Sequence, residues 1–157
     1  GRFVEGWGIF RGMLRHGLSP DQSNFAAAVN VVVGVCDLTS LENLRTLAIK
    51  IGFERDVVIG TAILNAYTRD GKGLDLAVKF FEGMPEVNEY TRATMISSLS
   101  QVGRLDEAVL VFESDPEKSI ECQTALLTAF AQKGKIHDAR VMFEQIQNPN
   151  VVSWNAM

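Results

Sequence analysis

A ten-residue pattern recurs along this chain at a nearly fixed interval. The segment 103–112, GRLDEAVLVF, aligns with 134–143, GKIHDARVMF, and glycine, an aliphatic residue, alanine and phenylalanine hold the same places in both. A step of the same length toward the N-terminus reaches Ala77 and Phe81, with one residue inserted in the turn before them. Periods of roughly 20 to 50 residues are typical of repeat architectures. The chain is therefore expected to stack similar units, each of which contacts its neighbours.

A second apolar stretch precedes each copy of this pattern. The stretches lie at 57–67, 90–99 and 120–130, and their apolar or small residues recur at helical spacing. Each unit is therefore predicted to form a helix, a short glycine-containing turn and a second helix. Because neither helix buries its apolar face alone, the units are expected to form a continuous core. Two recurring residue types are predicted to lie in that core: Ala77, Ala108 and Ala139, and Phe81, Phe112 and Phe143.

The segment 22–56 is less regular than the rest. Valines dominate its first half, and leucines recur every three residues in its second half. The valines are also compatible with a strand. The surrounding repeats favour two helices, at roughly 22–34 and 39–51.

Composition limits the possible classes of protein. Hydrophobic residues make up 46% of the 157 residues, which is typical of a globular chain. No apolar run approaches the roughly 18 residues of a membrane-spanning helix, and the first residues have neither signal nor transit character. The net charge of −4 argues against non-specific, salt-driven binding of nucleic acid by the whole chain. It does not exclude a local groove that reads bases.

Residues that bind metals or perform catalysis are sparse. The two cysteines, Cys36 and Cys122, are far apart and are predicted to be free buried thiols in a reducing compartment. His16 and His137 stand in polar contexts and are predicted to lie on the surface. The H-x-E and C-x-x-C pattern of zinc-dependent base deaminases is absent. We therefore predict no catalytic residue, no metal site and no cofactor.

Five segments in phase resemble pentatricopeptide repeat proteins. Residues 103–112 are similar to the second helix of that family's unit, and 17–21, GLSPD, resemble the end of its standard unit. Residues 49–56, IKIGFERD, resemble the end of its long variant, 81–85, FEGMP, its short variant, and 151–155, VVSWN, its usual opening. The resemblance covers the whole chain. It implies an all-α, right-handed superhelical solenoid of antiparallel helix-turn-helix repeats.

The resemblance also implies a division into repeats. It gives a C-terminal part of a repeat at 1–21, a long repeat at 22–56, short repeats at 57–88, 89–119 and 120–150, and the start of another at 151–157. This mixture is similar to a plant organelle subclass involved in site-specific C-to-U RNA editing. The chain is therefore expected to be a fragment of a longer array from a mitochondrion or chloroplast. Its uncapped ends would favour self-association.

Proteins of this family bind single-stranded RNA at one base per repeat. The fifth and last residues of a repeat read the base, and the second residue stacks on it. The base-reading pairs that follow are Ala26 with Asp56, Thr61 with Asn88, Ala93 with Ser119, and Thr124 with Asn150, followed by Asn155 alone. The stacking residues are Val58, Tyr90, Glu121 and Val152.

These pairs imply a particular RNA sequence. Threonine with asparagine resembles the family's adenine combination, whereas Ala26 and Ala93 lack a hydrogen-bonding group. The predicted reading from 5′ to 3′ is any base, A, any base, A, pyrimidine. Glu121 departs from the apolar residue expected for stacking. The implied partners are an organellar transcript and editing-factor proteins, with no membrane.

Other interpretations of the same residues remain open. Thr61 and Thr124 are also compatible with exposed positions on the first turn of a helix, and Asn88 and Asn150 with turn or N-cap positions. A protein-interaction scaffold without RNA binding is the alternative function, and the acidic charge balance suits it. Salt-sensitive RNA binding would favour the first function, and salt-insensitive protein binding the second.

Overall fold

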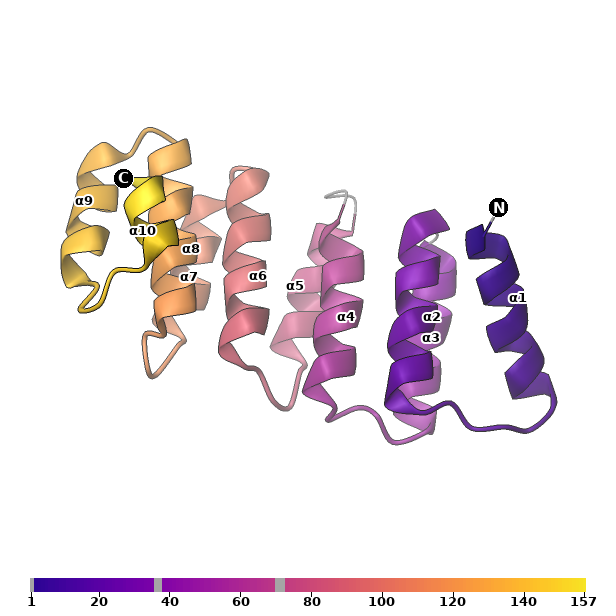
Figure 1. Cartoon of the computed structure of the whole chain (residues 1–157). Helices are drawn as coiled ribbons and strands as arrows, with labels where there is room; N and C mark the ends of the chain where they lie inside the picture. Colours follow the sequence, from indigo (N-terminus) through magenta and orange to yellow (C-terminus); the bar gives the residue numbers. More distant parts are fainter. Residues whose placement is uncertain (1, 36–37, 70–72) are drawn as a thin grey trace. The chain divides into compact units, whose positions relative to one another are not determined.

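The computed structural model describes residues 2–35, 38–69 and 73–157, and these form helices without any strand (Figure 1). The predicted all-α fold of helical repeats is confirmed. The chain divides into two compact units, residues 1–86 and 87–157. The helices of the first unit are α1 (Arg2–Arg15), α2 (Gln22–Val35), α3 (Leu38–Lys50), α4 (Val57–Thr68) and α5 (Leu74–Glu82). Those of the second are α6 (Glu89–Gln101), α7 (Leu105–Glu113), α8 (Ile120–Gln132), α9 (Ile136–Gln145) and α10 (Val151–Ala156).

In the first unit, α2 packs against α1, α3 and α4, and α4 packs in turn against α3 and α5. The valine-rich segment is a helix, so the strand alternative is wrong. Its buried residues Phe25, Val29 and Val32 follow the i, i+4, i+7 spacing of one helical face. The ring of Phe25 meets Phe10 and Phe53 edge-on, with centroids 6.1 and 5.8 Å apart. These contacts override the β propensity of valine because they bury the apolar side of the helix.

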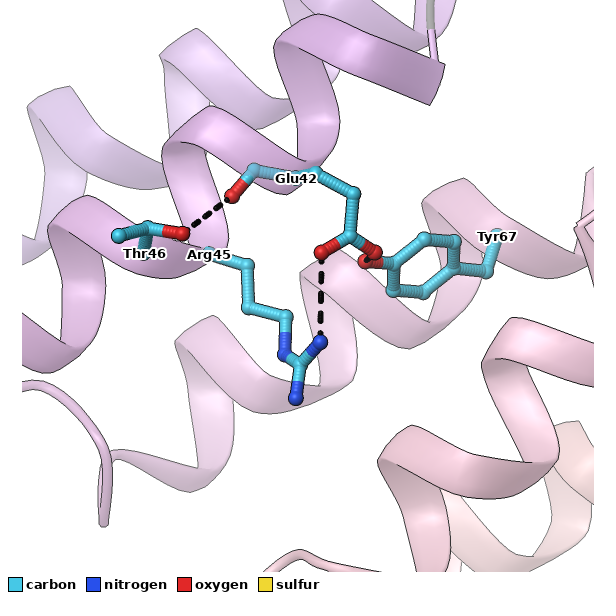
Figure 2. Close-up of polar contacts among 4 residues, drawn as sticks. All are labelled: Glu42, Arg45, Thr46 and Tyr67. Carbon is cyan, nitrogen blue, oxygen red and sulfur yellow. Dashed lines mark hydrogen bonds and ion pairs between the residues drawn. The ribbon is translucent and has the colours of Figure 1, made fainter.

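A polar network joins α3 to α4 in the same unit (Figure 2). The hydroxyl of Tyr67, a residue that is only 1% exposed, donates a hydrogen bond to the Glu42 carboxylate. Burial and this carboxylate raise the pKa of Tyr67 above its usual value. Arg45 Nη1 lies 3.3 Å from Glu42, and its guanidinium lies over the Phe80 ring of α5. The network therefore provides a partner for a buried hydroxyl and links three helices.

In the second unit, α6 packs against α7 and α8, and α8 also packs against α7, α9 and α10. The recurring glycines end the first helix of each pair: Gly103 and Gly134 have φ of +89° and +72°. The amide that follows each glycine bonds back to a carbonyl near the end of that helix, from Arg104 to Leu99 and from Lys135 to Phe130, both at 2.9 Å. Glycine suits this left-handed position because it has no Cβ. The recurrence of glycine in the sequence thus reflects helix termination.

The recurring alanines are confirmed as core residues, since Ala77, Ala108 and Ala139 are at most 1% exposed. The prediction for phenylalanine holds for Phe112, which is 9% exposed. It is wrong for Phe81 and Phe143, which are half-buried. Phe143 packs edge-on against Trp154, at 4.7 Å between centroids, and Trp154 is itself 63% exposed. Next to Phe81, the preceding residue Phe80 packs against Tyr67, with the two ring centroids 5.9 Å apart.

The remaining predictions for single residues have mixed outcomes. Cys122 is a buried free thiol, and burial raises its pKa to about 11. Cys36 lies outside the described residues. His16 and His137 are exposed, as predicted. No helix in the part of the chain that the structure describes is long and apolar enough to cross a membrane. The same part shows no cluster of three or more His, Cys, Asp or Glu that could hold a metal ion.

Candidate nucleic-acid interface

The predicted base-reading and stacking residues lie directly before, or among the first five residues of, helices α2, α4, α6, α8 and α10. These helices begin at Gln22, Val57, Glu89, Ile120 and Val151, the residues with which the predicted repeats begin. The division into repeats itself stays a prediction. Ala26, Asp56, Val58 and Thr61 belong to the first unit, and the other predicted site residues belong to the second.

Asn88 and Asn150 are the N-caps of α6 and α10. Asn88 Oδ1 accepts hydrogen bonds from the amide and the hydroxyl of Thr91, at 2.9 and 2.7 Å. Asn150 Oδ1 likewise accepts hydrogen bonds from the amide and the hydroxyl of Ser153, at 2.9 and 3.0 Å. Both asparagines use only their carbonyl oxygen for capping, and neither Nδ2 group has a partner among the described residues. Capping therefore leaves two N–H donors on each side chain for a ligand.

Thr124 and Asn150 are joined through Ser153. The hydroxyl oxygens of Thr124 and Ser153 lie 3.1 Å apart, and Ser153 donates its proton to Asn150. Because Ser153 uses its only hydroxyl proton for Asn150, the hydroxyl of Thr124 must be the donor in the hydrogen bond between Thr124 and Ser153. Thr124 is 8% exposed, so the interpretation of it as an exposed first-turn residue is wrong. The structure brings this predicted pair together within the second unit.

Two predicted reading residues of the first unit have structural contacts. Asp56 caps α4 by accepting the amides of Val58 and Ile59, at 2.9 and 3.1 Å. Its two carboxylate oxygens also accept hydrogen bonds from Gln22 Nε2, at 3.0 and 2.9 Å. The half-buried Thr61 donates its hydroxyl proton to the Val57 carbonyl, at 2.7 Å. Ala26 is half-buried and has no polar side-chain atom.

Ser119 differs from Asn88 and Asn150 because its side chain does not cap the helix that follows it. Its amide and its hydroxyl both donate to Asp115 Oδ2, each at 2.9 Å. Asp115 is 5% exposed. Burial tends to raise the pKa of its carboxyl, but the hydrogen bonds from Ser119, Cys122 and the Glu117 amide together outweigh burial and hold the pKa below its usual value. Asp115 is therefore ionised at neutral pH.

An open hollow in the second unit lies between the start of α6 and the loop from α7 to α8. Asn88 and Ser119, which the sequence predicts as base readers, both line it. Arg92 is the basic residue in the lining, and its Nη1 donates to Ser114 Oγ at 2.9 Å. The carboxyl residues in the lining are Glu89, Asp115, Glu117 and Glu121. Negative charge therefore predominates in this hollow.

Three of the four predicted stacking residues are exposed apolar side chains. Val58, Tyr90 and Val152 are 57%, 60% and 57% exposed. Such residues on the first turn of a helix provide surface on which a base can stack. Glu121 is half-buried and carries a carboxylate, so it lacks this surface.

Sequence reasoning missed Thr91, Ser153 and Asp115. Thr91 and Ser153 each stand three residues after an asparagine, a spacing that is typical of a helix N-terminus with a local side-chain cap. Asp115 stands where Met84 stands one repeat earlier and Ile146 one repeat later, so its charge breaks an otherwise apolar place. A charged residue at a place that is apolar in both neighbouring repeats is the sequence signal that would have identified Asp115.

Comparison with known proteins identifies the family of these repeats. A family model described as PPR repeat matches residues 90–114 and 124–150. A putative pentatricopeptide repeat-containing protein of Arabidopsis thaliana is 32% identical over 101 residues, which cover 64% of this chain and 12% of the relative. A chloroplastic pentatricopeptide repeat-containing protein from the same plant is 30% identical over 103 residues, which cover 66% of this chain and 11% of that relative. A mitochondrial pentatricopeptide repeat-containing protein of that plant is 32% identical over 100 residues, which cover 64% of this chain and 15% of that relative. This chain thus spans only a small part of these relatives' length, and it belongs to the pentatricopeptide repeat family.

Proposed function

We propose that this chain binds single-stranded RNA at one base per repeat and acts in organellar RNA processing or C-to-U editing. Family membership supports the RNA ligand. The names of two relatives, one chloroplastic and one mitochondrial, support an organellar location. Because the chain covers only 11% to 15% of the length of the relatives compared, the target transcript and any editing-factor partners belong to the same proposal.

The link from Thr124 through Ser153 to Asn150 is the observation that carries this proposal. Since Thr124 donates its proton to Ser153, its oxygen is left as an acceptor. Asn150 keeps its amide N–H groups as donors. An acceptor beside a donor complements the Watson–Crick edge of adenine, which offers its N6 amino group beside the N1 acceptor. The hydrogen-bond directions therefore support adenine at this repeat.

The exposed apolar residues support the same ligand. Tyr90 and Val152 stand at the second places of α6 and α10 and present more than half of their surface to solvent. Stacking on an aromatic side chain such as Tyr90 contributes roughly 1–3 kcal/mol per base. Stacking of this kind is tolerant of sequence, so the polar pairs would supply selectivity.

The test is an anisotropy titration of the whole chain. The RNA carries any base, A, any base, A, pyrimidine, and a second RNA has U in place of the second A. We expect tighter binding to the first RNA by roughly 10-fold, and weaker binding of both as salt rises. Equal affinity for the two RNAs would remove the base-reading assignment. Absence of RNA binding, together with salt-insensitive binding of a protein, would favour the scaffold alternative.

A further inference from the structure

We propose that a pocket between α3, α4 and α5 binds a small, neutral aromatic molecule of one or two fused rings. The pocket lies within the first unit and has a volume of about 180 Å³. For comparison, an apolar cavity of about 150 Å³ is large enough to hold benzene. None of the predicted base-reading or stacking residues lines this pocket, so the site is separate from the candidate nucleic-acid interface.

Much of the pocket lining is apolar and buried. Ala48 of α3 and Ile59 and Ile63 of α4 belong to it, and each is at most 4% exposed. Phe53, in the turn after α3, and Phe80 of α5 add two aromatic rings. Transfer of an aromatic molecule from water to such a surface is favourable, and its ring can pack edge-on or offset against these two rings. The lining therefore favours an aromatic ligand.

Two glycines leave this space open. Gly60 is the fourth residue of α4, and Gly83 is the C-cap of α5. In the second unit, Arg92 is the fourth residue of α6 and Ser114 is the C-cap of α7. Arg92 Nη1 donates to Ser114 Oγ at 2.9 Å, so this pair fills the place that corresponds to the two glycines. The pocket thus depends on the sequence of the repeat 57–88.

The other helices that begin a predicted repeat also carry a large fourth residue: Phe25 in α2, Gln123 in α8 and Trp154 in α10. Gly60 is the exception, and the space beside it is used by Met84. A Cβ on residue 60 would lie 2.6 Å from Met84 Cε. The thioether of methionine makes favourable contacts with aromatic rings, and its flexible side chain adapts to irregular shapes. Met84 therefore provides an adaptable wall for an aromatic ligand.

The charges at the pocket favour a neutral ligand. Of the lining residues, Arg45 and Glu54 are charged. Arg45 Nη1 lies 3.3 Å from the Glu42 carboxylate (Figure 2). Its guanidinium also lies 5.5 Å from the centroid of the Phe80 ring. A cationic ligand would meet the like charge of Arg45, and an anionic ligand would meet that of Glu54. A charged ligand would also lose hydration in these apolar surroundings.

The experiment titrates the whole chain, labelled at the isoleucine methyl groups, with indole and follows the methyl resonances by NMR. We expect saturable shifts at Ile49, Ile59 and Ile63, which line the pocket, with a Kd of about 0.1–1 mM. Ile96 and Ile146 of the second unit should not shift. Tryptamine and indole-3-acetate carry the same rings with a positive and a negative charge, and they should bind about 10-fold more weakly.

Variants that fill the pocket should weaken binding. The double change Gly60→Arg with Gly83→Ser introduces the pair that the second unit has at the same places, and it should weaken indole binding by about 10-fold or more. Gly60→Ala requires only the flexible end of Met84 to move and should have a smaller effect in the same direction. Gly8→Arg, at an exposed position of α1 where a Cβ meets no atom within 4 Å, is the matched control and should bind indole like the unmodified chain.

Three results would overturn the proposal: shifts that grow without saturation, shifts that spread over isoleucines of both units, and unchanged indole binding by the folded double variant. Tighter binding of either charged relative would overturn the preference for a neutral ligand. Thermal melting of each variant checks that the fold is retained. If the double variant does not fold, the comparison of Gly60→Ala with Gly8→Arg decides, and equal indole affinity of these two would contradict the site. RNA titrations test the proposed function separately.

Discussion

The hydroxyl oxygens of Thr124 and Ser153 lie 3.1 Å apart, although the two residues belong to successive predicted repeats. Ser153 also donates to the N-cap residue Asn150 at 3.0 Å. The two residues predicted to read one base are therefore coupled through the first turn of the next helix. A change in that turn should alter base reading without touching either reading residue.

Ser153→Ala tests this coupling. Loss of the bridging hydroxyl frees the Thr124 proton, so Thr124 no longer presents only an acceptor. We expect the preference for A over U at the fourth RNA place to fall by roughly 3- to 10-fold. Competition titrations with the two RNAs measure this ratio. Ser23→Ala, at an exposed position of α2, is the matched control and should keep it.

The double change Thr61→Asn with Asn88→Asp tests the repeat 57–88. The family's pattern implies a shift from A toward U at the second RNA place, because aspartate offers acceptors where asparagine offered donors. Aspartate is also a good N-cap, so α6 should stay capped. Titrations with RNAs that differ only at this place measure the shift. An unchanged preference would contradict the assignment of these two residues.

Asn88→Ala tests the capping role apart from RNA. It removes the acceptor for the Thr91 amide and hydroxyl. A lost N-cap costs about 1 kcal/mol of folding stability. Urea denaturation measures the loss, and Asn88→Asp should retain most of the stability. If alanine and aspartate gave equal stability, the cap would contribute nothing.

Ala108→Leu tests the close approach of helices at the recurring alanine. Ala108 is 0% exposed, so a larger side chain must displace its neighbours. Overpacking of this kind costs about 1–3 kcal/mol. Chemical denaturation should show that loss, whereas Ala27→Leu, at an exposed position of α2, should change stability little. Tolerance of leucine at both positions would contradict tight packing there.

Alkylation tests the state of Cys122. The thiolate is the reactive form, and burial raises the pKa of this thiol to about 11. Modification by iodoacetamide at mildly alkaline pH should therefore be slow in the folded chain and should accelerate as the pH approaches that pKa. Peptide mass mapping follows Cys122 separately from Cys36. Guanidinium-unfolded chain is the control, and equally fast modification in both states would mean that the thiol is not protected.

The recurring pattern, the helices and the turns can be predicted from the sequence alone. These depend on local rules: apolar spacing defines the helical faces, and a glycine at a left-handed position ends the helix, as at Gly103 and Gly134. The buried alanines also follow from the sequence, because a small residue that recurs at a fixed place marks close helix packing.

Which polar groups form hydrogen bonds with one another depends on tertiary packing and could not be predicted from the sequence. The burial of Thr124, its contact with Ser153 and the capture of Ser119 by Asp115 depend on how a helix start packs against a neighbouring loop or turn. The partial exposure of Phe143, through its contact with Trp154, has the same origin. Periodicity assigns a residue to a face of its helix, but the direction of a hydrogen bond is fixed by atoms that packing brings within about 3 Å.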